Sequence, residues 1–248
     1  MKFFRIFGRD APQVIDGSVT AIESVALTHV GHVRAVNEDR ILNLPDSKLW
    51  AVADGMGGHQ SGDVAAQIAI DALGDLASSG QILCGDDILR AIQSANMLIF
   101  DRYSEAERRS GTTIVAALLV NDRLEIFWAG DSRAYRLRGG TWQQLTCDHS
   151  VVQQMVDAGA LPPSAAAHHP KSNVITRALG VDREVVIDRV AIPIVTGDII
   201  MLCSDGVSRT LDADRVGAPP LRALAQSLID RALMRDGSDN ASLVVIQA

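Results

Sequence analysis

Two short links between apolar segments constrain the fold of this chain more than any other feature. Residues 121–123 (NDR) join the apolar run 112–120 to the run 124–129, and residues 138–140 (RGG) close the strand-like segment 134–138. Links this short join antiparallel neighbours, because a parallel connection needs roughly a dozen residues or more. The sequence therefore predicts antiparallel sheet.

Helical and strand-like segments alternate irregularly along the chain. Apolar residues that recur every three or four positions predict helices over 63–77, 87–101 and 221–235. Ser61 is a candidate N-cap of the first helix, and Gly237 follows the last one, where a helix end favours glycine. The further predicted strands are 25–29, 40–44, 49–53, 185–192, 199–203 and 242–247. Clusters of strands separated by helices favour α+β layers over a doubly wound sheet.

Length and cysteine content suit a domain that folds in a reducing compartment. The chain has 248 residues, 47% of them hydrophobic, which fits one large domain or two small ones. Residues 1–20 are weakly patterned and are expected to form a loose leader, so 21–248 are predicted to be one domain. The cysteines are odd in number and lack metal-ligand spacing, which favours an intracellular setting.

The charge balance argues against several kinds of partner. The net charge is −7, whereas broad binding of nucleic acid or anionic membranes needs a basic surface. Arg5 and Arg9 interrupt the N-terminal apolar residues, so a signal peptide is not expected. No run approaches the ~18–20 apolar residues of a membrane span. The sequence predicts a cytoplasmic protein that concentrates cations.

Aspartates recur at the ends of apolar runs. Asp54, Asp131 and Asp205 each follow such a run, Asp239 precedes one, and the acidic pair 38–39 lies between two predicted strands. For any one of them a simple turn is a good interpretation, because aspartate and glycine favour turns. Carboxylates brought together, however, repel and cannot all stay ionised without a cation. Mg²⁺ and Mn²⁺ prefer oxygen ligands, so the repeated pattern favours a site for two such ions.

Six motifs in order make the chain similar to a known family. RAVNEDR, ADGMGGHQSG, AGDSRAY, TCDHS, CSDG and GSDNAS resemble the metal-dependent serine/threonine protein phosphatases of type 2C, over about residues 24–248. The resemblance implies a four-layer α/β/β/α sandwich, with two antiparallel sheets flanked by helical pairs. It implies a stand-alone bacterial catalytic domain, monomeric, that hydrolyses phosphoserine and phosphothreonine in phosphorylated proteins and opposes a cognate Ser/Thr kinase.

The same resemblance implies a set of metal ligands and a mechanism. Two Mn²⁺ or Mg²⁺ ions would activate a hydroxide that lies between them, with a third, weaker ion in bacterial members. Asp54 would bridge the two ions, and Gly55 would offer its carbonyl oxygen. Asp205 and Asp239 would hold one ion, and Asp131 would support the third together with Asp205. The implied ligands are Glu38, Asp39, Asp54, Gly55, Asp131, Asp205 and Asp239, of which Glu38 and Asp39 would serve the second ion directly or through water.

Other candidate residues surround these ligands. Arg34 is the expected phosphate clamp, because a guanidinium group can bind two phosphate oxygens at once. Met56 stands where eukaryotic members often have a histidine, the proposed general acid. His59 is one substitute, and a metal-bound water is the favoured one. His149 could orient a loop or approach the substrate, and the structural role is favoured.

The segment 147–172, here called the flap, is predicted to lie beside the active site and to contact the phosphoprotein. Within it, 159–173 carries prolines and small residues and is expected to be a surface loop. His168 and His169 are interpreted as solvated rather than as metal ligands.

Three alternative functions are weighed against this reading. A phosphoprotein-binding scaffold without activity would need a broken acidic set, and every expected acidic position is filled. Another two-metal hydrolase would act on nucleic acid or small phosphoesters, and the net charge argues against nucleic acid. A phosphatase dedicated to one regulatory protein is compatible with the sequence.

Overall fold

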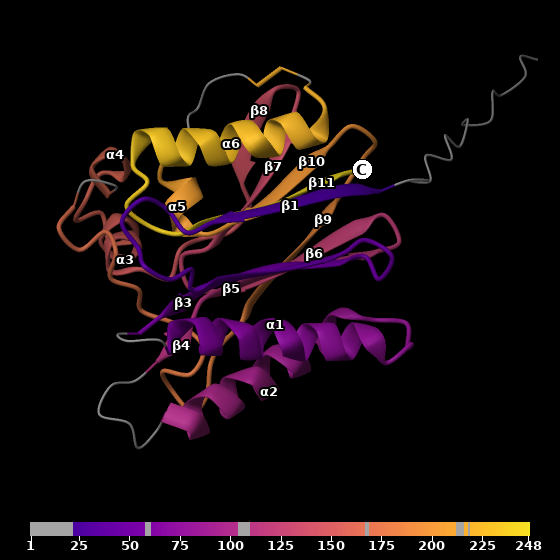
Figure 1. Cartoon of the computed structure of the whole chain (residues 1–248), viewed down its shortest axis with the longest axis horizontal. Coiled ribbons are helices and arrows are strands. Elements are labelled where there is room, and N and C mark those ends of the chain that lie inside the picture. The colour runs from indigo at the N-terminus through magenta and orange to yellow at the C-terminus, as the bar shows by residue number, and fades with distance from the viewer. Residues whose placement is uncertain (1–21, 58–60, 104–109, 167–168, 212–215, 218) are drawn as a thin grey trace, which may run out of the picture.

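Two antiparallel sheets pack face to face in the computed structural model (Figure 1). The structure describes residues 22–57, 61–103, 110–166, 169–211, 216–217 and 219–248. The five-stranded sheet has the order β1 (Glu23–His29), β11 (Ala241–Gln247), β10 (Ile199–Cys203), β7 (Arg133–Arg138) and β8 (Thr141–Gln144). The six-stranded sheet has the order β2 (Asp39–Leu44), β3 (Leu49–Met56), β5 (Ile114–Val120), β6 (Arg123–Ala129) and β9 (Asp188–Pro193), with β4 (Gly111–Thr112) paired to β3.

Helices cover both outer faces of this sandwich. The pair α1 (Gly62–Ser78) and α2 (Gly85–Tyr103) lies on the six-stranded sheet, and α6 (Leu221–Arg235) lies on the five-stranded sheet (Figure 1). Three shorter helices, α3 (Val151–Asp157), α4 (Pro163–Ala166) and α5 (Asp205–Ser208), lie toward one end. This arrangement confirms the predicted α+β sandwich. Within the described residues, no helix is long and apolar enough to cross a membrane.

The central strands are buried on both faces, which explains their continuous apolar runs. Along β10, Ile200 and Leu202 pack between the sheets with Trp50 of β3, while Met201 packs under α6. Successive side chains of a strand point to opposite faces, so a strand covered on both sides needs an apolar residue at nearly every position. The two sheets therefore share one inner core, and each packs a second one against its helices.

The long elements match their predictions better than the short ones. Helix α6 spans the predicted 221–235, and Gly237 follows it with a φ of 63°, a conformation that glycine adopts without strain. Ser61 is the N-cap of α1 by position, but its side chain makes no capping hydrogen bond.

Two regular elements of the flap segment and its surroundings were not predicted. Helix α3 is only seven residues long, with Val152 as its one buried side chain. The four-residue helical turn α4 lies inside 159–173, which was predicted to be a surface loop without a long regular element. Ser150 starts α3 by accepting a hydrogen bond from the backbone N–H of Gln153. Elements this short contain too few residues to show the periodic pattern of apolar residues from which a helix is predicted.

Candidate active site

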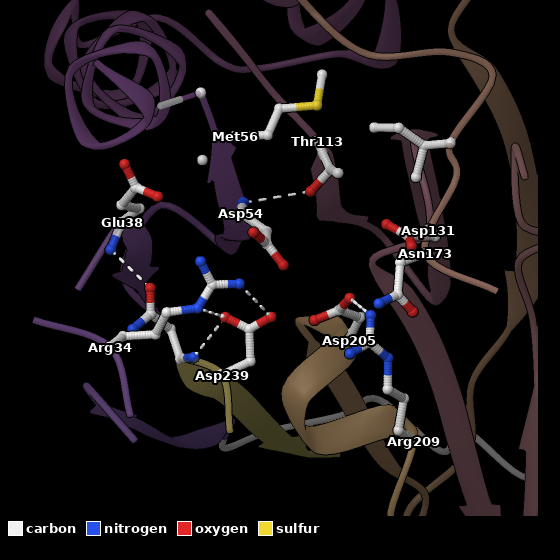
Figure 2. A pocket seen from close by; sticks show the side chains of 14 residues that line it. Arg34, Glu38, Asp54, Met56, Thr113, Asp131, Asn173, Asp205, Arg209 and Asp239 are labelled. Carbon is white, nitrogen blue, oxygen red and sulfur yellow. Dashed lines mark hydrogen bonds and ion pairs between the residues drawn. The ribbon is translucent and has the colours of Figure 1, made fainter. Parts of the chain in front are cut away.

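A pocket of about 380 Å³ opens at the end of the sandwich that carries α5. Acidic side chains reach it from separate parts of the chain: Asp54 from the end of β3, Asp205 from the start of α5, and Asp239 from the turn before β11. Asp131 comes from the turn between β6 and β7, and Glu38 directly precedes β2. Figure 2 shows these carboxylates around one hollow. The structure thus brings together all the acidic residues that the sequence singled out except Asp39, which is buried and does not line the pocket.

Sheet pairing places two of the carboxylates side by side. Asp39 of β2 is the cross-strand partner of Asp54 of β3. The backbone N–H of Asp54 donates to the hydroxyl of Thr113, and its carbonyl accepts from the N–H of the same residue at 2.9 Å. The Thr113 hydroxyl also bonds the Ser132 hydroxyl, next to Asp131. The backbone around Asp54 is therefore held on both sides, while its side chain faces the pocket.

Gly55 is required by crowding rather than by a turn. A Cβ at this position would lie 2.2 Å from the carbonyl oxygen of Gly62 and 2.7 Å from that of Glu38. No other residue type fits there without moving the start of α1 or the strand beside it. The simple turn interpretation of Asp54-Gly55 is therefore wrong, since both residues lie within β3.

Burial and mutual repulsion disfavour ionisation of the clustered carboxyl groups. Burial raises the pKa of Asp39 to about 7, although hydrogen bonds from Ser242 and Ser204 oppose the shift. Burial, followed by the charges of Asp205 and Asp148, raises the pKa of Asp131 to about 7. The pKa of Asp54 is likewise raised by burial and by Asp39. A cation would relieve this repulsion, because opposite charge favours the ionised form.

Unpartnered oxygens indicate where a cation fits. Among the described carboxyl groups, the Oδ1 atoms of Asp39, Asp63 and Asp205 are buried without a hydrogen-bond partner. Asp205 lines the pocket, and Asp39 lies beside Asp54 on the neighbouring strand. Buried polar atoms are normally satisfied, and hard divalent ions bind carboxylate oxygens. The donor set is made of oxygens throughout, which suits Mg²⁺ or Mn²⁺. The pocket therefore fits the ions that the sequence predicted.

Two arginines pair with carboxylates of this pocket. Arg34 binds Asp239 through two contacts of 2.9 Å, Nε to Oδ1 and Nη2 to Oδ2. Arg209 donates from Nη2 to Oδ2 of Asp205. With these pairs in place, the described His, Cys, Asp and Glu side chains form no ready-made cluster of three around one metal position. The arginines act as counter-ions for two of the predicted ligands.

Asn240 and Ser204 support the site, and the sequence analysis did not single them out. The Asn240 side chain accepts from the N–H of Glu38 at 2.8 Å and donates to the carbonyls of Val30 and Val36. The Ser204 hydroxyl donates to Asp39 at 2.9 Å. Both residues lie beside acidic residues in the GSDN and CSDG motifs, and that adjacency is the one signal that could have found them.

The remaining candidates lie beside the pocket or outside the described residues. Met56 lines the pocket and has no proton to donate, and His59 is not among the described residues. His149 stacks on Trp128 with ring centroids 6.2 Å apart and accepts from the N–H of Gly130 at 3.1 Å. It therefore anchors the turn before Asp131, in agreement with its structural interpretation.

The segment that follows the flap reaches the pocket. Asn173 and Ile175 line it, and Ile175 forms a β-bridge with Ser150 at the base of the flap. His169 accepts a local hydrogen bond from the N–H of Lys171, whereas His168 lies outside the described residues. The flap is thus fastened at its base next to the acidic side chains.

Comparisons with known proteins agree with this geometry. Residues 29–239 match the family model described as Protein phosphatase 2C. The chain is 34% identical over 236 residues to the serine/threonine phosphatase stp of Listeria welshimeri, covering 89% of this chain and 93% of that protein. It superposes with a TM-score of 0.83 on PppA, a key regulatory component of T6SS in Pseudomonas aeruginosa, at 34% identity over 93% of this chain and 99% of that one. The catalytic domain of the phosphatase PstP in complex with 2 manganese ions gives a TM-score of 0.80 at 34% identity, over 91% of this chain and 97% of that one.

Proposed function

The chain belongs to the protein phosphatase 2C family and is a metal-dependent serine/threonine protein phosphatase, and from this premise we propose which residues hold the ions and the substrate. Asp54 would contribute to both ions, with the Gly55 carbonyl beside it. Asp205 and Asp239 would hold one ion, and the pair 38–39 would serve the other, directly or through water. Support comes from the unpartnered Oδ1 atoms of Asp39 and Asp205 and from the shared pocket.

The chain's own groups position the phosphate and the ions. When bound, the ions supply Lewis acidity, which makes water a nucleophile near neutral pH. Arg34 lies at the pocket with its side chain half exposed, so it can exchange Asp239 for two phosphate oxygens. Asp239 would then be free to help hold a cation. The pocket side chain at position 56 is a methionine, so the proton for the leaving alcohol comes from His59 or from water, as the sequence analysis left open.

Partners and setting extend the proposal beyond the site. The substrates are phosphoproteins, and we propose that a cognate Ser/Thr kinase produces them. The cytoplasmic location, the monomeric state, the choice between Mn²⁺ and Mg²⁺, and the role of Asp131 in holding a third ion stay predictions from the sequence. The domain limits 21–248 also stay a prediction, since residues 1–21 lie outside the described part.

One observation carries the proposal: acidic side chains from separate parts of the chain meet in one pocket, where Oδ1 of Asp205 has no hydrogen-bond partner, and Asp39, with a second unpartnered Oδ1, lies beside Asp54 on the next strand. The test is hydrolysis of a phosphothreonine peptide by the purified chain, before and after dialysis against EDTA. We expect loss of turnover on chelation and recovery with Mn²⁺. Full turnover in excess chelator would refute the metal-dependent mechanism.

A further inference from the structure

Arg209 is held at a fixed place next to the metal-binding carboxylates. It follows the single turn of α5, and its N–H donates to the Asp205 carbonyl at 3.0 Å. The turn packs closely against the residues before β11 at Gly206, where a Cβ would lie 2.0 Å from the carbonyl oxygen of Asn240. The buried Val207 anchors the same turn in the core under α6. Arg209 therefore cannot leave the pocket by a shift of its backbone, only by a rotation of its side chain.

The guanidinium of Arg209 lies on the Asp131 side of the pocket. Asp131, Asn173 and Arg209 line the same pocket as Asp205, and Figure 2 shows Arg209 extending past Asp205 toward Asn173. The Arg209 side chain is 29% exposed, and the paired Asp205 side chain is 15% exposed. In the described part of the chain, Asp205 is its one hydrogen-bond partner. Its other N–H groups are available to a second carboxylate.

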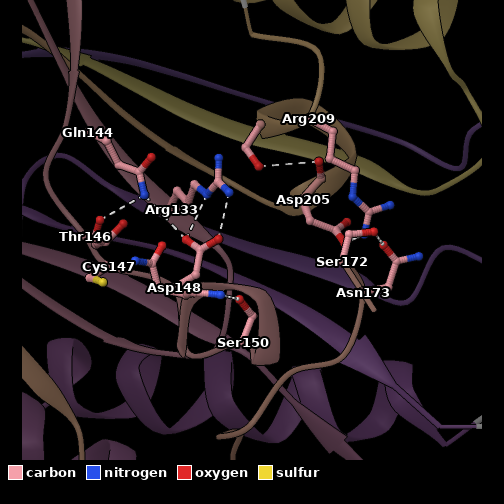
Figure 3. A network of polar contacts seen from close by, with 12 residues as sticks. Arg133, Gln144, Thr146, Cys147, Asp148, Ser150, Ser172, Asn173, Asp205 and Arg209 are labelled. Carbon is pink, nitrogen blue, oxygen red and sulfur yellow. Dashed lines mark hydrogen bonds and ion pairs between the residues drawn. The ribbon is translucent and has the colours of Figure 1, made fainter. Parts of the chain in front are cut away.

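The other arginine near Asp131 is already engaged. Arg133 binds Asp148 in a two-point contact, Nε to Oδ1 at 2.8 Å and Nη2 to Oδ2 at 2.7 Å (Figure 3). It also donates to the hydroxyl of Tyr135. Figure 3 shows this pair to be separate from the pair of Arg209 and Asp205. Arg209 is thus the guanidinium group available to the carboxylates of Asp131 and Asp205.

The charges of the site balance without a third ion. The carboxylates there are those of Glu38, Asp39, Asp54, Asp131, Asp205 and Asp239, and the guanidinium groups are those of Arg34 and Arg209. Before a phosphate group binds, two divalent ions and two guanidinium groups neutralise six carboxylates. A third divalent ion would leave an excess of two positive charges and would also face the guanidinium of Arg209 at short range, where like charges repel.

We propose that the guanidinium of Arg209 takes the place of a third metal ion between Asp205 and Asp131. The proposal rests on the two-ion site proposed above and revises the expectation that Asp131 and Asp205 bind a further ion. In this chain the third ion binds only when the Arg209 side chain rotates out of the pocket. The arginine supplies a permanent positive charge, since guanidinium does not lose its proton in proteins, but it cannot coordinate and acidify a water as a metal does.

The test is the number of Mn²⁺ ions bound, measured by equilibrium dialysis with metal analysis and by titration calorimetry. The parent chain should bind two ions. Arg209→Gln should bind a third ion, because one neighbouring positive charge is removed. Its dissociation constant for this ion should be at least about tenfold lower than that of any third Mn²⁺ that the parent binds. Adding Asp131→Asn to Arg209→Gln should return the count to two.

Matched variants separate this role from general effects. Arg209→Lys, which retains the charge, should bind two ions. Arg222→Gln removes a charge from the exposed side of α6 and should behave as the parent does. Arg209→Ala gives a second neutral side chain, so the test does not depend on the folding of one variant, which circular dichroism checks.

The outcomes are distinguishable. A third ion bound equally by the parent and by Arg209→Gln would overturn the role of Arg209 and leave the two-ion site intact. A count of two in both neutral variants would overturn it as well. A parent chain that binds no Mn²⁺ would refute the two-ion site itself.

Discussion

Strand β3 passes through two regions of opposite character. From Leu49 to Ala53 its side chains are fully buried and alternate between the inner core and the core under α1. The next residue, Asp54, enters the acidic pocket. Burial of the apolar part stabilises the fold, whereas desolvation of neighbouring carboxylates costs stability until cations arrive. Stability and activity should therefore be separable between adjacent residues of one strand.

The largest expected effect is on the acidic side of this comparison. Asp54→Asn removes a carboxylate proposed to serve both ions, so kcat at saturating Mn²⁺ should fall on the order of 10³-fold, in line with several kcal/mol of lost charge stabilisation. Thermal stability without metal should be unchanged or higher, because a buried carboxyl group whose ionisation its neighbours disfavour is replaced by a neutral amide. Peptide hydrolysis and calorimetry measure the two effects.

The matched control for this change is Asp230→Asn, on α6, where the carboxylate accepts from Gln226 far from the pocket. It should retain parental turnover. Near-normal kcat in Asp54→Asn at saturating Mn²⁺ would contradict the ligand assignment.

The core side of the comparison predicts the reverse pattern. Leu118→Ala empties a site that is 1% exposed under α1 and α2, and should lower the free energy of unfolding by about 2–5 kcal/mol. Turnover per folded molecule should stay near the parental value. Leu98→Ala, at a side chain that is 61% exposed, should cost about 0.5 kcal/mol or less. Chemical denaturation measures the loss of stability in both variants. A strong loss of turnover in folded Leu118→Ala would show that core stability and activity are not separable along β3.

A smaller effect is expected where the pocket meets the substrate. Arg34→Ala should leave the count of bound Mn²⁺ ions at two and raise KM by about 10- to 100-fold, because a two-point, charge-assisted contact with phosphate is lost. The fall in kcat should be smaller than the rise in KM. Arg34→Lys retains the positive charge but cannot make the two-point contact, so its KM should lie between that of the parent and that of Arg34→Ala. Loss of bound metal in Arg34→Ala would show that the residue shapes the ion site instead.

Stability without metal should also depend on pH in a direction set by the pocket. Burial holds the pKa of Asp39 and of Asp131 at about 7, against roughly 3.9 for aspartate in an unfolded chain. The folded state therefore binds more protons between these values, so the free energy of unfolding falls as pH rises from about 4 to about 7. The melting temperature of the EDTA-treated chain should be lower near pH 8 than near pH 5.5.

Two additions sharpen this pH experiment. Asp39→Asn should reduce the difference in melting temperature between pH 5.5 and pH 8, because it removes one of the carboxyl groups that cause this difference. Saturating Mn²⁺ should abolish it, since bound cations favour ionised ligands. His149 acts in the opposite sense, because burial and then Arg177 lower its pKa. A melting temperature that rises with pH in the chelated chain would mean that the acidic cluster does not dominate.

The same contrast explains how far the sequence could be interpreted. The strands of the core can be recognised in the sequence because both of their faces are buried. All five residues of β10 are apolar, and β11 contains four consecutive apolar residues, 243–246. The acidic residues were found because each lies where such a run stops. Their repetition distinguished them from ordinary turn residues.

What the sequence could not predict are contacts between distant segments. Arg34 meets Asp239 across 205 positions, and Asn240 ties the turn before Glu38 to β11. The contact of Arg209 with Asp205 is local, but α5 is a single turn without a readable period. A sequence shows which residue types stand at strand ends, whereas the folded chain decides which arginine faces which carboxylate.

The smallest effect is expected at the flap, defined above as residues 147–172, which is neither core nor acidic pocket. Ala165 lies in α4, in which no side chain is fully buried, and the base of the flap is fastened beside the pocket by the bridge of Ser150 and Ile175. Loops next to a site commonly select substrates. Ala165→Glu should therefore lower kcat/KM for phosphoproteins by about three- to tenfold, because the new carboxylate repels the phosphorylated segment.

Hydrolysis of p-nitrophenyl phosphate distinguishes contact with the protein substrate from damage to the pocket. This small ester should not reach the flap, so Ala165→Glu should change its turnover by less than about twofold. Ala223→Glu introduces the same charge on the exposed side of α6 and should leave both substrates unaffected. Equal losses on both substrates in Ala165→Glu would mean that the flap acts on the pocket through its base at Ser150 and Ile175. In that case the flap would act as part of the acidic pocket, and the molecule would have two functionally distinct regions, the core and the pocket, rather than three.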